Sequence, residues 1–337
     1  MAVTRLGDVI VPEEFTSYTV QNTMEASALV QSGIVQRNGE IEAQLRAGAD
    51  SFTVPFWLDL GDDEANIAND DPEISAAPRK ITAEKQIVRK SFLHNSWSAM
   101  NLASELSGDD ALRRIQERAA AYWTRQTQRR LIGSLNGILL DNVATDDGDM
   151  VLDITDAVGA AAEFATVAVI DAAGTMGDQM GNIAGIAVHS DIYRKMLKLD
   201  LVEFVPDSQS RMIATYRGMA VVVDDLMPKE TITPEGDDAY DVYTTALFAP
   251  GAVGWGMTAP RIADGTEIEN KPGAGRGGGQ QILHSRVNLA IHPAGFQWRE
   301  QSVADESPTI AELALAANWS RVVERKAAGL AFLKSKL

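Results

Sequence analysis

A long proline-free segment, residues 107–143, constrains the fold more than any other part of the sequence. It reads SGDDALRRIQERAAAYWTRQTQRRLIGSLNGILLDNV and opens with Ser107 and Asp110 at the spacing of a helix capping box. Apolar residues then recur at steps of three or four positions for most of the length from Leu112 to Leu139, with breaks at Gln126 and Arg129. This periodicity predicts one long amphipathic helix, which must pack along a large part of the folded chain.

The composition is that of a folded and strongly acidic protein. Of 337 residues, 45% are hydrophobic, which is enough for a sizeable core, and the formal net charge is −17. Such a charge opposes nonspecific adhesion to nucleic acid, because phosphate contacts need Lys and Arg. There is no cysteine, which excludes disulfides and thiolate chemistry and fits a reducing cytoplasm. Neither a secretory signal nor an apolar run of the roughly 20 residues needed to span a membrane is present.

Two strand patterns on either side of an acidic segment predict a long two-stranded excursion. Residues 52–56 alternate apolar and polar side chains, and residues 81–92 are rich in Ile, Val and alternating Lys or Arg. Pro55 cannot donate to a sheet, which favours an edge position for the first strand. Seven acids and no base lie between the strands: Asp59, Asp62, Asp63, Glu64, Asp70, Asp71 and Glu73.

The predicted long helix carries an excess of positive charge. Its six arginines are Arg113, Arg114, Arg118, Arg125, Arg129 and Arg130. A nucleic-acid stripe is one interpretation, but no aromatic or glycine-rich platform accompanies it in the sequence. The other interpretation pairs this helix with an acidic surface of the same chain or of a neighbour, and the acidic excursion is a matching candidate.

The glycine-rich stretch GAGRGGG, residues 273–279, has the spacing of a dinucleotide-binding loop without its context. Such a loop follows a strand and opens a helix, whose N-terminus holds the phosphates. Here residues 262–270 and 281–291 both alternate with a period of two. We therefore predict a connection between two strands, with a demand for positive φ at Gly275 and Gly278. A nucleotide-dependent enzyme is a remote alternative.

The sequence indicates no catalytic, cofactor-binding or metal site. The four histidines stand far apart: His94, His189, His284 and His292. His189, Ser190 and Asp191 are the residue types of a hydrolase triad, but neighbours in sequence do not form one, so they predict a strand end and a helix cap. The acidic excursion lacks the ligand pattern of a calcium loop. We expect no enzymatic activity and no cofactor.

Helical patterns alternate with short apolar strands from residue 153 to residue 254. The predicted order is an alanine-rich helix, a buried strand, a short helix capped by Ser190 or Asp191, and further strands. This order is typical of an α/β or α+β subdomain. The final segment, residues 307–337, begins with helix-capping residues and predicts a C-terminal helix.

Several ordered blocks of the sequence resemble the major capsid protein of tailed bacteriophages, the Hong Kong 97 type of fold. The blocks are IAVHSDIYRKMLKLDLVEFV, YRGMAVVVDDLMP, YTTALFAPGAVGWG, LHSRVNLAIHPAGFQW and SPTIAELALAANWSRVVERKAAG. They cover roughly residues 180–330, whereas residues 1–150 match by layout. An encapsulin-like compartment, which has the same fold, is the alternative.

The resemblance implies an α+β fold with an N-terminal arm, an extended β-hairpin loop, a long spine helix, and peripheral and axial domains. The implied segments are 1–49 for the arm, 50–93 for the extended loop, 94–152 for the peripheral domain with the spine helix, 153–254 for the axial domain, 255–306 for the peripheral strands and 307–337 for a C-terminal helix. The chain would assemble into hexamers and pentamers of an icosahedral head. The virion would enclose double-stranded DNA without sequence-specific binding.

The resemblance also implies partners and contacts. The arm begins almost at once, so scaffolding is expected from a separate protein, together with a portal and, in some heads, a decoration protein. Assembly would take place in the host cytoplasm without a membrane. Certain relatives crosslink lysine to asparagine; Lys80, Lys85 and Lys90 lie on the excursion, but no partner is identified and crosslinking is not predicted. We expect the seven acids and six arginines to meet between neighbouring subunits, with pairing inside one chain as the alternative.

Overall fold

The computed structural model describes residues 35–60, 64–65, 67–68, 70–71, 73, 79–206, 212–233 and 239–337. Most of the expected N-terminal arm therefore lies outside the described residues, as do Asp62 and Asp63 of the acidic excursion.

The long helix predicted from the sequence is present as α4 (Ala111–Thr145), which has 35 residues. Asp110 is its N-cap and accepts hydrogen bonds from two amides of the first turn, at 3.0 and 3.2 Å. Ser107 instead ends a separate helix, α3 (Asn101–Ser107), which Gly108 terminates in a left-handed conformation. The predicted capping box between Ser107 and Asp110 is thus wrong, because a helix end and a turn separate the two residues.

A six-stranded sheet holds the strands predicted around the acidic excursion. Its order is β1 (Gln36–Arg37), β11 (Val253–Thr258), β13 (Gln280–Pro293), β3 (Ala83–Met100) and β2 (Ser51–Trp57), with β12 (Thr266–Lys271) also paired to β13. The edge position of β2 agrees with the expectation from Pro55. The helix α2 (Gly39–Leu45) packs against β11, and its Ile41 and Leu45 form a small core with Val88 of β3.

The glycine-rich stretch connects the antiparallel strands β12 and β13, which confirms the predicted hairpin and removes the helix that a phosphate loop requires. Gly275 has a φ of 63° and Gly279 a φ of 82°, a region that favours glycine. Gly278 is not among the residues with positive φ, so its predicted conformational demand is wrong. Its amide donates to the Gly275 carbonyl at 3.3 Å, in a turn whose left-handed positions are filled by its neighbours.

An eight-stranded sheet forms the second half of the subunit. Its order is β4 (Val151–Asp153), β16 (Leu330–Lys336), β10 (Tyr240–Phe248), β5 (Gly185–Val188), β8 (Met219–Val223), β7 (Met212–Tyr216) and β6 (Glu203–Pro206), with β9 (Lys229–Ile232) also paired to β10. The accompanying helices are α5 (Thr166–Gly174) and α6 (Ser190–Lys198), and short 3-10 turns cover Gly159–Ala162 and Gly177–Asn182. His189 is the N-cap of α6, accepting from the Asp191 amide at 3.1 Å, rather than Ser190 or Asp191.

The predicted C-terminal helix over residues 307–337 is wrong. Only α7 (Ile310–Leu313) is α-helical there, and it is followed by β15 (Trp319–Arg321), which pairs with β14 (Phe296–Trp298), and then by β16. Two 3-10 turns, Ala316–Asn318 and Arg325–Ala327, separate these elements. Leu330 to Leu333 are all buried, because β16 is a central strand covered on both faces. A short apolar run of this kind fits a buried strand and a helix equally well.

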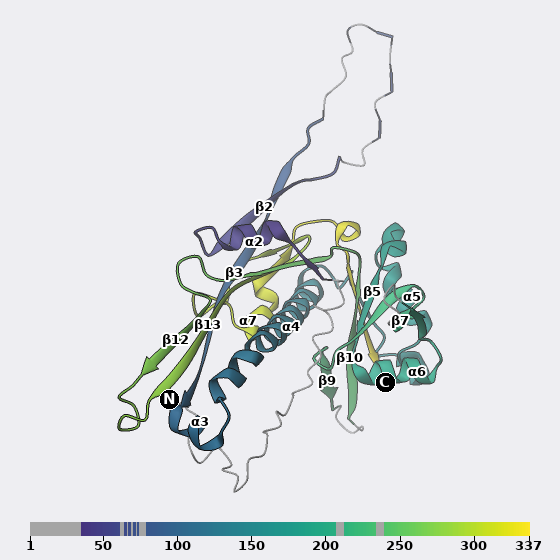
Figure 1. Ribbon diagram of the computed structural model, residues 1–337. Helices are drawn as coiled ribbons and strands as arrows, with labels where there is room; N and C mark the ends of the chain where they lie inside the picture. Colours follow the sequence, from purple (N-terminus) through teal and green to yellow (C-terminus); the bar gives the residue numbers. More distant parts are fainter. Residues whose placement is uncertain are drawn as a thin grey trace.

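The two halves share one hydrophobic core around α4. Ile138 and Leu139 of α4 pack in the same cluster as Phe248 of β10, Phe332 of β16 and Trp298 of β14. Figure 1 shows α4 running beside β3 and β13 on one side and towards the sheet of β5 and β10 on the other. A second cluster lies inside the eight-stranded half, between its strands and the helices α5 and α6. The subunit is therefore built as two sheets joined along a helix.

Candidate intersubunit surface

The N-terminal half of α4 and the adjoining strand β3 form a basic groove of about 310 Å³. We call it the basic aromatic groove; its lining residues are Trp97, Arg114, Ile115, Arg118, Ala119, Tyr122 and Arg125. The rings of Trp97 and Tyr122 meet edge to face with centroids 5.2 Å apart. Next to them, the Trp123 indole donates to the Ser285 hydroxyl at 2.8 Å, which fastens α4 to β13. The groove thus combines three arginines with a rigid aromatic wall.

Of the six arginines predicted on the long helix, Arg113 and Arg114 pair with acids of their own chain. The Arg113 Nε lies 3.3 Å from the Glu117 carboxylate. The Arg114 Nε lies 3.0 Å from Asp109, and its Nη1 lies 3.3 Å from Glu117. These are exposed or half-exposed pairs of modest strength. Arg113 and Arg114 therefore have acidic partners inside their own chain.

Arg130 lies inside the subunit rather than in the groove. Its side chain is buried, and its Nη1 donates to the Pro308 carbonyl at 2.8 Å and to the Ser91 hydroxyl at 3.3 Å. Burial lowers the pKa of the Arg130 guanidinium from its ordinary value. Arg129, one position earlier, is half-buried and does not line the groove. Of the six predicted arginines, Arg114, Arg118 and Arg125 are the ones that share one surface.

Two of the described acids of the excursion make local contacts. The Asp59 carboxylate accepts from the Leu60 amide at 2.8 Å, and Asp71 accepts from the Glu73 amide at 3.0 Å. Apolar side chains are interspersed with the acids and face solvent: Leu60 is 67% exposed and Ile67 is 88% exposed. The excursion therefore combines many acidic side chains with a few exposed apolar ones.

The excursion and the groove lie at opposite ends of β3. Ala83 begins the strand next to the excursion, and Trp97 stands 14 positions later, near its other end. At about 3.3 Å per residue, this separates the two by roughly 45 Å. Contact inside one chain would need the excursion to fold back along nearly the whole strand.

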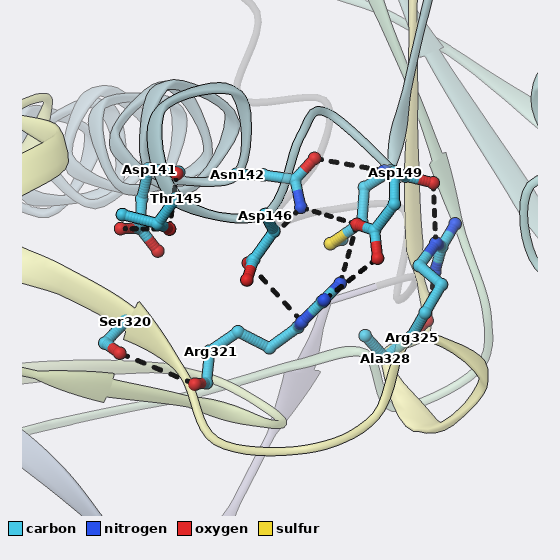
Figure 2. Close-up of polar contacts among 10 residues, drawn as sticks. Asp141, Asn142, Thr145, Asp146, Asp149, Ser320, Arg321, Arg325 and Ala328 are labelled. Carbon is cyan, nitrogen blue, oxygen red and sulfur yellow. Dashed lines mark hydrogen bonds and ion pairs between the residues drawn. The ribbon is translucent and has the colours of Figure 1, made fainter.

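A polar cluster joins the end of α4 to the C-terminal segment. Arg321 of β15 forms a two-pronged pair with Asp149, at 2.7 and 2.9 Å. Asn142 of α4 donates to the same carboxylate at 2.7 Å, and Arg325 donates to the Asp149 carbonyl at 3.2 Å. Figure 2 shows Asp149 between the two arginines and the helix end. Arg325 also donates to the Thr175 hydroxyl, just after α5, at 2.7 Å, so the cluster ties both halves together.

Burial and pairing oppose one another in this cluster. Burial acts to raise the pKa of Asp149, but hydrogen bonds from Arg321 and Asn142 outweigh it and leave that pKa below its ordinary value. Burial lowers the pKa of Arg325 to about 10, so this residue stays charged at neutral pH. Nearby Asp141 is buried, and burial raises its pKa. The cluster therefore has a structural role, which is to hold the end of α4, β15 and the segment after α5 together.

Sequence reasoning missed a pair of stacked histidines. His94 of β3 and His284 of β13 lie on adjacent strands, with ring centroids 5.4 Å apart and the nearest ring nitrogens at 3.2 Å. The second ring nitrogen of His284 lies 3.2 Å from the Glu269 carboxylate. The sequence gives no sign of the pair, since strand register alone brings together residues 190 positions apart. Within the described ranges, no group of three or more His, Cys, Asp or Glu side chains is placed to hold a metal ion.

None of the helices in the described part of the chain is long and apolar enough to cross a bilayer.

The structure combines a long helix between two sheets with a hairpin, β2–β3, that extends from one of them. The capsid of Ralstonia phage GP4 matches the structure with a TM-score of 0.62 at 10% sequence identity, covering 100% of this chain and 98% of that one. The cyanophage Pam1 capsid matches with a TM-score of 0.62 at 9% identity, covering 96% of each chain. The Hong Kong 97 type of α+β fold is thereby confirmed.

The family follows from a closer relative. The major capsid protein of Bacillus phage SPP1 is 34% identical over 340 residues, covering 100% of this chain and 99% of the relative. No family model matches the chain. The chain belongs to the phage major capsid proteins, and its function is that of a structural subunit which associates with copies of itself into the head shell of the virion.

Proposed function

We propose that the chain builds the hexamers and pentamers of an icosahedral head that encloses the double-stranded DNA of a tailed phage. The full-length similarity to a phage major capsid protein supports this proposal most directly. The formal charge of −17 fits a shell that encloses DNA without binding it tightly. A separate scaffolding protein, a portal and, in some heads, a decoration protein complete the proposed assembly, which takes place in the host cytoplasm.

The proposed domain division follows the two sheets. The six-stranded sheet, with α3 and α4, forms the peripheral domain, and the eight-stranded sheet, with α5 and α6, forms the axial domain. The chain passes from the proposed axial domain to the proposed peripheral domain at residues 249–252, between β10 and β11. It returns through β16, so the C-terminal strand belongs to the proposed axial domain.

At residue level, the proposed contact is between the acidic excursion of one subunit and the basic aromatic groove of its neighbour. Charge complementarity supports it: residues 59–73 contain seven acids and no base, and the groove contains Arg114, Arg118 and Arg125. The exposed Leu60 and Ile67 would pack against the wall formed by Trp97 and Tyr122. The distance along β3 leaves a neighbouring subunit as the natural partner.

Each ion pair in such a contact is weak. Exposed pairs contribute roughly 0–1 kcal/mol each, and salt at about 0.15 M screens them beyond roughly 8 Å. The contact would gain its effect from repetition around a closed shell. Assembly should therefore become less efficient as the salt concentration rises.

Charge reversal tests the proposed contact. We expect Asp70→Lys, Asp71→Lys and Glu73→Lys together to block shell assembly and to leave the circular dichroism spectrum and urea unfolding of the free subunit unchanged. Adding Arg114→Glu, Arg118→Glu and Arg125→Glu should restore assembly, measured by sedimentation and negative-stain electron microscopy.

A matched control separates this contact from a general effect of net charge. Glu105→Lys, Asp171→Lys and Glu230→Lys reverse three exposed acids outside the excursion and should assemble like the wild type. Normal assembly of the excursion variant, or equal loss of assembly in the control, would rule out the contact. Both results would leave the membership of the capsid family intact.

A further inference from the structure

A second, much smaller cavity lies where β3, β13, α4 and the segment before α7 meet. Its volume, about 20 Å³ for the centre of a guest the size of water, exceeds the roughly 10–15 Å³ that one ordered water requires. Apolar side chains form most of its wall. The polar side chains that line it are Arg89, Ser91, Arg130, His292 and Trp298.

The cavity wall contains several buried hydrogen-bond donors without acceptors. Among the described residues, none accepts a hydrogen bond from Arg89 Nε, Arg130 Nε or Trp298 Nε1. The indole of Trp319, which meets Trp298 edge to face, does have an acceptor, the Leu313 carbonyl at 2.8 Å. An unpaired buried donor is destabilising, so three of them on residues that line one cavity favour a guest that accepts hydrogen bonds.

Of the two arginines at the cavity, Arg89 has carboxylate partners, whereas Arg130 has neutral ones. Arg89 pairs with Asp50 at 2.6 Å and with Glu300 at 3.0 Å. Within the described part of the chain, the hydrogen bonds of Arg130 go only to neutral oxygens, those of Pro308 and Ser91. A buried cation without a counter-ion is costly, and no carboxylate lines the cavity.

We propose that this cavity is a binding site for a small monovalent anion of the size of chloride or bromide, held by Arg130, Arg89 and the Trp298 indole N–H. Three donors and a cation exclude a metal ion, and the volume excludes an organic ligand. Water is the competing guest, but it offers no charge to Arg130. Burial lowers the pKa of His292 to about 4, so at neutral pH the imidazole is uncharged and leaves Arg130 as the cation that needs a partner.

The site lies at the base of the extended hairpin. Arg89 connects the start of β2 through Asp50 to the C-terminal segment through Glu300 and the Glu306 carbonyl, the latter at 2.9 Å. Arg130 connects α4 to the same segment at Pro308. A bound anion would therefore fasten the hairpin, the spine helix and the C-terminal segment to one another.

Bromide provides the direct test, because its anomalous scattering distinguishes it from water. Crystals of the full chain, or of an assembled capsomer, grown in sodium bromide should show one anomalous peak in the cavity within hydrogen-bond distance of Arg130. Absence of a peak there, with ordered water in its place, would overturn the proposal. A peak that appears only at molar bromide would show binding at crystal concentration only and would equally overturn it.

Stability in solution provides a second test. Bound halide stabilises the folded state by an amount that grows as ln(1 + [halide]/Kd). The melting temperature should therefore rise when chloride replaces gluconate at constant ionic strength, and the rise should follow the logarithm of the chloride concentration above Kd. Trp298→Phe removes one donor and keeps an aromatic ring, and should raise several-fold the chloride concentration at which the melting temperature begins to rise. Trp255→Phe is the control, because the Trp255 indole N–H is also unpaired among the described residues but does not line the cavity. An equal chloride response in all three proteins would contradict the site.

Discussion

His292 shows how a single half-buried side chain couples the stability of this subunit to pH. It lies on β13 and lines the small cavity beside Arg89 and Arg130. Burial lowers its pKa from 6.5 to about 4 in the folded chain. Because the unfolded chain binds this proton below about pH 6.5, while the folded chain binds it only near pH 4, the folded state loses stability on acidification across that window.

We predict that replacing His292 by glutamine removes this pH dependence. The shift corresponds to a contribution of up to about 3 kcal/mol, present above pH 6.5 and lost as the pH falls towards 4. Urea unfolding of the free subunit from pH 7 to pH 4, in a buffer without halide, measures the effect. The difference in unfolding free energy between His292→Gln and the wild type should grow in favour of the variant at lower pH. A constant difference would contradict the assignment.

At the scale of elements, the packing of α4 against the C-terminal segment depends on close approach at Gly137. A Cβ atom built there would lie 2.3 Å from the Leu313 carbonyl oxygen and 2.6 Å from the Trp319 ring. Neither the Leu313 backbone nor the buried Trp319 ring can move far enough to accommodate this Cβ atom. The two elements can therefore pack at this distance only while position 137 has no side chain.

Gly137→Ala should destabilise the subunit by about 1–3 kcal/mol, because the strain of overpacking exceeds the roughly 1 kcal/mol that alanine gains in a helix. Gly174→Ala at the end of α5 is the matched control, since a Cβ atom there meets nothing within 4 Å. It should be neutral or stabilising by up to about 1 kcal/mol. Urea unfolding of both variants measures the contrast, and equal effects would contradict this account of the packing.

The elements that could be predicted from the sequence are those defined by local patterns. The periodicity of α4 and the alternation of β12 and β13 depend on neighbouring residues, and all three elements formed as expected. β16 could not be told from a helix, because Leu330–Leu333 is a short run buried on both faces. Its identity as a strand depends on pairing with β10, a segment distant in sequence.

The surfaces were harder to predict than the elements, because they too depend on residues that are distant in sequence. The arginines of α4 were evident in the sequence, but the aromatic wall beside them comes partly from Trp97 of β3, which only the fold brings next to Tyr122. Arg130 was grouped with the surface arginines, yet the helix directs it into the subunit, where Pro308 and Ser91 accept its hydrogen bonds. Spacing along a helix indicates charge density and does not indicate which face is covered.

At the scale of the whole molecule, the subunit has the architecture expected for repeated association. One core joins both sheets along α4, while the β2–β3 hairpin extends from the body (Figure 1). The basic aromatic groove lies near the other end of β3. In the proposed contact, the protruding hairpin of one subunit would meet the groove of the next, so the two surfaces in contact would be unlike. Such contacts propagate from one subunit to the next until curvature closes the assembly.

Electron microscopy of the purified full chain, produced alone and together with a scaffolding protein encoded by the same phage, tests the central claim most directly. The account predicts closed shells of uniform curvature, with six-fold and five-fold clusters of subunits visible in averaged images. A monodisperse monomer or dimer over a wide range of protein concentration, with the scaffold supplied, would contradict it.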